Sequence, residues 1–222
     1  MSNRIALTHR IELRFNKRVQ VSTHWLRLRP APHTKVTIEA YSLKVEAEPH
    51  FLNWVRDPYE NHLARLDLPE PVSSLGLVVE VVANLNPLNP FNFLVEPYAF
   101  KVPFEYPPHL AKELAPYLRL GRTGSQLDSW LANLRLEPGY IVERLTELNL
   151  QVQQAFPQRY EASPGMVDLE AVLRNKSASA SELAWLLTLS LRKLGMAARF
   201  TSGYHIMLAS SEGLFDFARM HA

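Results

Sequence analysis

Hydrophobic and polar positions alternate over strand-length stretches throughout the first half of the chain. Apolar residues recur at every second position, and Pro, Asn and Asp separate one stretch from the next. The clearest stretches are RIELRF (10–15), VTIEAYSLKVEA (36–47), HLARLDL (62–68), LGLVVEVVANL (75–85) and YAFKVPF (98–104). No long helical pattern interrupts them. Residues 4–105 are therefore predicted to form antiparallel β-structure, and a small β-sandwich is the natural architecture.

The segment HWLRLRP (24–30) shows this alternation residue by residue. Leu26 and Leu28 share one face of the predicted strand, and Arg27 and Arg29 share the other. The two arginines are either an anion-binding patch or the solvated side of a half-buried strand. We favour the second interpretation, because antiparallel sheets commonly leave one face in water.

The period changes near residue 107, beyond which apolar residues recur at every third or fourth position. Helices are predicted within HLAKELAPYLRL (109–120), QLDSWLANL (126–134), YIVERLTELNLQVQQAF (140–156) and SPGMVDLEAVLRN (163–175). On the longest of these, Ile141, Leu145, Leu148 and Val152 share one face. The chain is thus predicted to have an α+β fold, with a β-rich domain over residues 1–106 and a second domain over residues 107–222.

The strongest helix signal lies in SASASELAWLLTLSLRKLG (177–195). Ser179 precedes Glu182 by three residues, which is the spacing of a capping box, and Gly195 is well placed to end the helix. One face carries Leu183, Leu187, Leu191 and Leu194. Further apolar residues cover most of the remaining circumference, so we expect this to be the central, buried helix. A strand is predicted to follow within ARFTSGYHIML (198–208).

The first turn of this helix is a place where proteins often position a nucleophile. Its unpaired backbone N–H groups and the positive end of the helix dipole both stabilise a thiolate. Here the position holds Ala180, whose methyl group has no such chemistry. The chain contains no cysteine, which excludes disulfides, thiolate metal sites and cysteine-dependent catalysis.

The segment around this helix resembles the core of the bacterial transglutaminase-like, or cysteine protease-like, family. The matching pieces are Ala184–Leu187, Leu194–Gly195, Ala197–Phe200 and Ser202–Tyr204. THWLRLRPAPHT (23–34), DPYENHLARL (57–66) and the segment 89–118 resemble the β-rich N-terminal region of the same family. The resemblance implies a papain-like arrangement. In it a Cys attacks an amide carbonyl, a His acts as base and an Asp orients that His, so that hydrolysis or transamidation follows.

Carried over position by position, the resemblance places the nucleophile at Ala180, which is inert, and the base at His221. The family's neighbouring Gly, Arg and Asp fall on Ala178, Ser181 and Glu182. Several changes together favour natural loss of the nucleophile over a single engineered substitution. The chain stops one residue after His221, before the strands and the orienting Asp that the family would supply. We therefore expect the core to be incomplete at its C-terminus, as in a truncated or fragmentary protein.

The leading hypothesis is a catalytically inactive, transglutaminase-like pseudoenzyme that binds a peptide or protein through its vestigial cleft. The rival is an amide-bond hydrolase or acyl transferase that uses Ser179 or Ser181, or that is completed by missing C-terminal sequence. A third hypothesis is that the sequence comes from a gene fragment without a selected role. We interpret Ser179 as a helix cap, and Asp216 lies off the alternation that would let it support His221.

Charge and composition limit the classes of binding partner that the sequence favours. The net charge is +2 and no run of Lys or Arg occurs, so neither nucleic acid nor an anionic membrane is favoured. We find no signal segment and no apolar run of about 18 residues, and we expect a cytoplasmic protein. No cofactor is predicted.

Tyr204 is expected to pack near the cleft and His205 to lie on the surface. The spacing of His24, His33, His50 and His62 does not suggest a zinc site.

Overall fold

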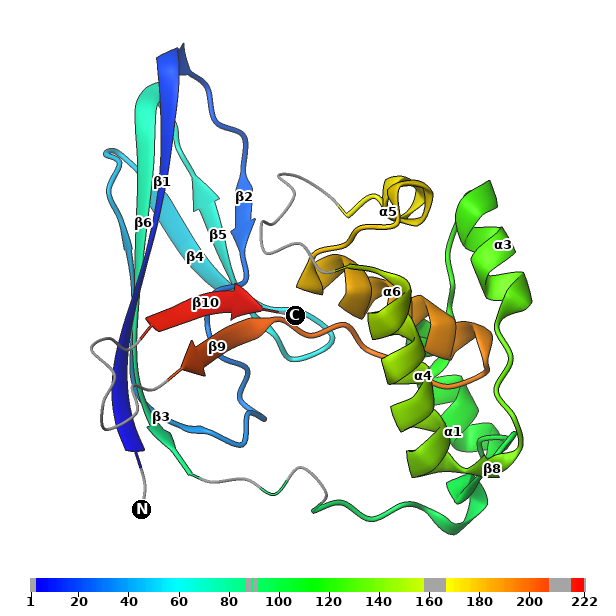
Figure 1. The fold of residues 1–222 in the computed structure, drawn as a ribbon. Coiled ribbons are helices and arrows are strands. Elements are labelled where there is room, and N and C mark those ends of the chain that lie inside the picture. The colour runs from blue at the N-terminus through cyan, green and yellow to red at the C-terminus, as the bar shows by residue number, and fades with distance from the viewer. Residues whose placement is uncertain (1–2, 87–88, 90–91, 158–166, 208–216, 222) are drawn as a thin grey trace, which may run out of the picture. The chain divides into compact units, whose positions relative to one another are not determined.

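A computed structural model of the chain describes residues 3–86, 89, 92–157, 167–207 and 217–221 (Figure 1). The chain divides into two compact units, residues 1–92 and residues 93–222. Both helices and strands are present, which confirms the predicted mixed α+β class. Among the described residues, no helix is both long enough and apolar enough to cross a membrane.

The first unit contains two antiparallel sheets of three strands each. One sheet has the order β1-β6-β3, formed by β1 (Asn3–Val19), β6 (Val72–Leu85) and β3 (Thr37–Val45). The other has the order β2-β5-β4, formed by β2 (His24–Leu26), β5 (His62–Asp67) and β4 (Phe51–Arg56). The predicted antiparallel β-structure is therefore confirmed for this half of the chain.

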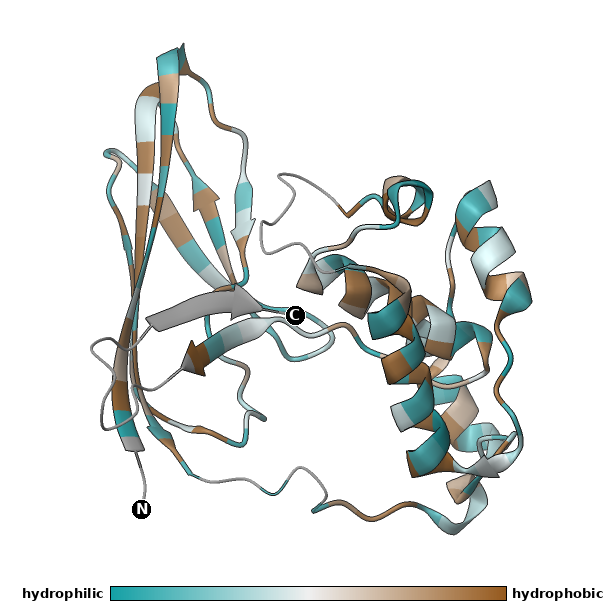
Figure 2. Cartoon of the chain, in the orientation of Figure 1, coloured by the Kyte–Doolittle hydropathy of each residue, from teal (hydrophilic) through white to brown (hydrophobic). Residues whose placement is uncertain are grey.

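Alternation along the strands produces the core of this unit. On β6 every second residue from Leu75 to Ala83 is buried, and Figure 2 shows hydrophobic and hydrophilic positions alternating along β1 and β6. The buried hydrophobic residues of β6 are Leu75, Leu77, Val79, Val81 and Ala83. Leu66 of β5 belongs to the same hydrophobic cluster as Leu75 and Leu77 of β6, so both sheets contribute to one core. A sandwich architecture remains the prediction for this unit.

The second unit is mainly helical, with short strands between and after the helices. Its helices are α1 (Pro108–Glu113), α2 (Ala115–Leu118), α3 (Ser125–Asn133), α4 (Ile141–Ala155), α5 (Leu169–Asn175) and α6 (Ala180–Lys193). All the predicted helical segments are thus confirmed, but the segment 109–120 forms two short helices. Pro116 explains the break, because it lacks the N–H group that would continue α1.

The segment 93–106 belongs to the second unit, whereas the sequence-based division assigned it to the first domain. The predicted strand over 98–104 is mostly wrong. Pro97–Ala99 forms a 3-10 turn (η1), and only β7 (Lys101–Val102) pairs, with β8 (Gly139–Tyr140). Proline rigidity favours the turn over a longer strand. The side chain of Val102 packs with Ile141 and Met196, which fixes this segment against the helices.

Candidate functional site

The start of α6 is held in place by the segment that leads into it. Lys176 adopts a left-handed conformation with φ of 49° and ends α5. The backbone N–H of Ala178 then donates to the carbonyl oxygen of Pro157 at 3.3 Å, and Ala178 is completely buried. These contacts anchor the chain immediately before the first turn of α6.

The predicted capping box is present at this turn. The backbone N–H of Ser179 donates to Oε2 of Glu182 at 2.6 Å, and the N–H of Glu182 donates to Oγ of Ser179 at 3.4 Å. The Ser179 hydroxyl also donates to Oε2 of Glu182, at 2.8 Å. Both residues are only 4% exposed, so this network is shielded from water and these hydrogen bonds have few competitors.

Ala180 is the first residue of α6 and is half-buried. The residues on either side of it are serines. Ser179 is buried, and its hydroxyl proton is held by the Glu182 carboxylate. Ser181 is half-buried, with its Oγ 3.2 Å from Oγ of Ser179. The arrangement is that of a helix cap, in which the Ser179 hydroxyl is buried and already engaged by the Glu182 carboxylate.

The body of α6 is buried, as predicted, but along a different face. Leu186 and Leu189 are 0% and 3% exposed, whereas the predicted leucine stripe at 183, 187, 191 and 194 is only partly buried. Ser190 is also fully buried, and its Oγ accepts a hydrogen bond from Nε1 of Trp130 at 3.1 Å. This hydrogen bond gives the buried hydroxyl the partner that it requires.

Gly195 ends α6, as predicted, with φ of +82°. Its N–H donates to the carbonyl of Arg192, and the N–H of Met196 donates to that of Leu191. This pair of bonds is a Schellman motif, which requires a left-handed residue and so favours glycine. The chain then continues toward β9 (Gly203–Met207), a shorter strand than the predicted 198–208.

His221 is the last residue of β10 (Phe217–His221), which pairs with β9 in antiparallel fashion and places His221 opposite Gly203. In Figure 1 the red strand β10 runs toward the N-terminal end of α6. The side chain of His221 and the whole of Asp216 lie outside the described residues. That Ala180 and His221 face one another therefore stays a prediction.

The structure also describes the surroundings of Tyr204, His205, His24 and His50. Tyr204 on β9 is half-buried, and this burial raises the pKa of its phenol, while His205 is exposed. In the first unit, Nδ1 of His24 bonds the carbonyl of Ser22, and Nδ1 of His50 bonds that of Ala47. Across the part of the chain that the structure describes, no group of three or more His, Asp or Glu residues could hold a metal ion.

Comparisons with known proteins identify these sheets and the helical core with its buried, capped helix as a transglutaminase-like fold. Residues 5–84 match the bacterial transglutaminase-like N-terminal region, and residues 130–216 match the transglutaminase-like superfamily core. The chain belongs to the bacterial transglutaminase-like family. The core match includes Ala180 but ends before His221.

The chain is also similar to a solved structure, "a Putative Cysteine Protease from Cytophaga hutchinsonii". The two share 10% sequence identity with a TM-score of 0.53, over 99% of this chain and 74% of the other. At this identity the likeness concerns the fold alone. No curated protein matches the sequence.

Proposed function

We propose that the chain is a catalytically inactive member of its family, and that it binds a peptide or protein segment at the cleft expected beside the start of α6. The observation that carries this proposal is that the chain has no cysteine and that Ala180 begins α6, where the resemblance assigns the nucleophile. The chemistry of the family requires a thiolate at the N-terminal end of the central helix. The first turn of α6 is nevertheless capped, because both hydrogen bonds of its capping box are present.

The capping box also argues against a serine enzyme. A serine nucleophile needs an accessible hydroxyl and a general base that can accept its proton. The Ser179 hydroxyl is buried and donates to the same carboxylate oxygen that accepts the Ser179 N–H. Moving it toward a substrate would break the cap. Of the two candidate serines, Ser181 therefore fits the rival mechanism better.

The unmodified chain is expected to show neither hydrolysis nor amine incorporation above background on glutamine-containing peptides. Substituting Ala180→Cys introduces the only thiol, so its reactivity can be followed directly with iodoacetamide. Because the helix N-terminus stabilises a thiolate, the rate of alkylation should show a lower apparent pKa than in the matched variant Lys193→Cys at the opposite end of α6. Equal pH profiles would contradict the assignment of position 180.

Turnover by the unmodified chain that His221→Ala abolishes would overturn the inactive assignment. Labelling of Ser181 by a fluorophosphonate probe would instead support the serine rival.

The binding role is tested by fluorescence polarisation with fluorescein-labelled, glutamine-containing peptides. Saturable binding that Ala180→Trp weakens supports the cleft, and binding that Ala180→Trp leaves unchanged contradicts it.

A further inference from the structure

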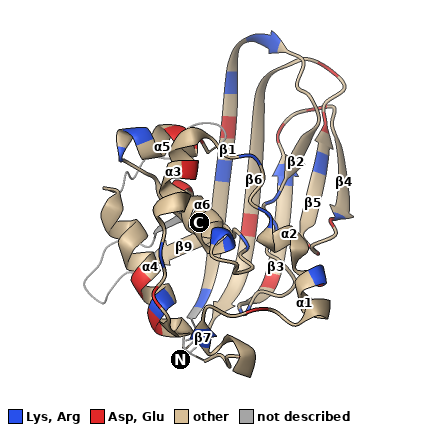
Figure 3. Cartoon of the chain, turned by 90° about the vertical axis from the view of Figure 1, so that its right-hand side faces the viewer, with Lys and Arg blue, Asp and Glu red and all other residues tan. Residues whose placement is uncertain are grey.

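The arginines of the first unit differ in their partners. Four are paired with a nearby carboxylate: the ion pairs are Arg4–Glu39, Arg10–Glu46, Arg14–Glu12 and Arg65–Asp67. Arg18 donates to the carbonyl of Pro71. Figure 3 shows charges of both signs along β1. In contrast, none of the ion pairs between described residues involves Arg27, Arg29 or Arg56. These three cations follow β2 or end β4.

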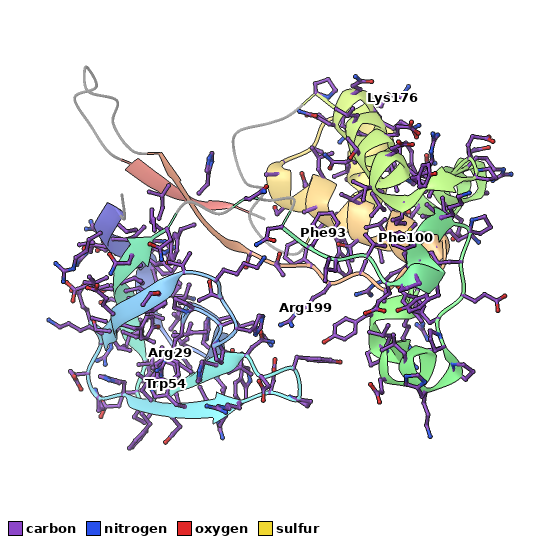
Figure 4. All side chains as sticks on the ribbon, turned by 90° about the horizontal axis from the view of Figure 1, so that it is seen from below. Arg29, Trp54, Phe93, Phe100, Lys176 and Arg199 are labelled. Atoms are coloured by element: carbon purple, nitrogen blue, oxygen red, sulfur yellow. The ribbon has the colours of Figure 1, made fainter. Side chains whose placement is uncertain are left out.

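Arg29 is held by aromatic rings. Its Cζ lies 5.5 Å from the ring centroid of Tyr41 on β3 and 5.4 Å from that of Trp54 on β4. Figure 4 shows Arg29 beside Trp54. The two rings meet edge to face with their centroids 5.9 Å apart. Cation–π contact orients a guanidinium without using its N–H groups, which therefore remain available to an anion.

The electrostatics of neighbouring groups show that positive charge gathers here. Partial burial lowers the pKa of His62, and the charges of Arg29 and Arg56 lower it further. Arg56 lies directly opposite His62 in the β4–β5 register. The nearby carboxylate of Asp57 is engaged by its own turn, since it accepts hydrogen bonds from the N–H groups of Tyr59 and Asn61.

Apolar surface and free backbone accompany these cations. Trp54 is 41% exposed, so its ring offers contact area beside Arg29. Among the described strands, β4 is an edge of its sheet. Its outward backbone groups can pair with an added extended segment, a common mode of peptide recognition.

We propose that Arg29, Arg56 and Trp54 form a binding site for an extended peptide segment that carries Asp or Glu. The carboxylates would bind the two guanidinium groups, and the peptide backbone would pair along β4. This site lies in the first unit and is independent of the cleft proposed at α6. An acidic peptide fits better than nucleic acid, because four other arginines of the unit are already paired with carboxylates and so contribute little to a basic track.

The test uses the full chain and fluorescein-labelled peptides of alternating Glu and Val residues, compared with peptides of alternating Gln and Val. The acidic peptide is expected to bind about tenfold more tightly at low salt. The double variant Arg29→Gln/Arg56→Gln should remove this difference. The matched control Arg4→Gln/Arg14→Gln loses the same charge from ion-paired arginines of the same unit, and should retain the preference.

Two further readouts separate a specific site from general charge attraction. In an NMR titration, a saturating acidic peptide should raise the pKa of His62, because it neutralises Arg29 and Arg56. Arg29→Lys keeps the charge and should keep most of the preference for the acidic peptide. If circular dichroism shows that Arg29→Gln unfolds the unit, Arg56→Gln alone tests the site. Equal losses in the control variant would overturn the proposal. So would tighter, Arg29-dependent binding of a single-stranded oligonucleotide.

Discussion

Substituting Leu186→Ala is expected to lower the free energy of unfolding of the second unit by about 3–4 kcal/mol, because it leaves a cavity in a closely packed core. Leu186 is 0% exposed and belongs to one cluster with Leu148 and Val152 of α4 and Leu127 of α3. The residue thus connects three helices of the unit. Urea unfolding, followed by the far-UV circular dichroism of the helices, measures the loss.

Two leucines serve as controls for this experiment. Leu187 is the next residue of α6 but is only partly buried, so Leu187→Ala should cost less than Leu186→Ala. Leu150 of α4 is 45% exposed, and Leu150→Ala should cost less than about 0.5 kcal/mol. A larger loss for Leu187→Ala would show that the leucine stripe is the core face after all. A broad, non-cooperative unfolding transition in the unmodified chain would favour the hypothesis of a gene fragment.

Substituting Glu182→Ala is expected to destabilise the second unit by about 3 kcal/mol. The change removes the acceptor of the Ser179 N–H and of the Ser179 hydroxyl, and it leaves both donors buried without that acceptor. Glu182→Gln keeps an oxygen acceptor and should cost less. Thermal unfolding of the variants measures the difference.

A double-mutant cycle assigns this loss to the capping box. Ser179→Ala alone should cost about 1 kcal/mol, as for other helix caps. In Ser179→Ala/Glu182→Ala the hydroxyl donor has gone with its acceptor, so the combined loss should be smaller than the sum of the two single losses. Glu143→Ala, in the first turn of α4 with a side chain 63% exposed, is the control and should be nearly neutral. Additive losses at 179 and 182 would contradict the coupling.

Much of the candidate site could be read from local sequence. The capping box of Ser179 and Glu182 and the terminal Gly195 depend on residues a few positions apart, and both are present as predicted. The identity of Ala180 at the first helical position follows from the same local signals. The alternation of the β-rich half likewise needed only the spacing of apolar residues.

Other features depend on residues that are distant in sequence. The buried face of α6 could not be selected from its composition, because the helix is apolar around most of its circumference. The choice of Leu186 and Ser190 is made by neighbours such as Trp130, which lies 60 residues earlier. The cation–π contact of Arg29 joins residues of two different sheets, so alternation alone predicted only that this arginine faces solvent.

The sequence by itself determined where the helices and most strands lie, how α6 begins and ends, and that no thiol is available at its first turn. These are consequences of local hydrogen bonding and of side-chain chemistry. Only the tertiary structure decided which face of α6 is buried, that the segment 93–106 packs with the helices, and that Arg29 is held between Tyr41 and Trp54. The physical reason is that burial and long-range contacts are properties of the packed chain, to which a local pattern contributes one surface at a time.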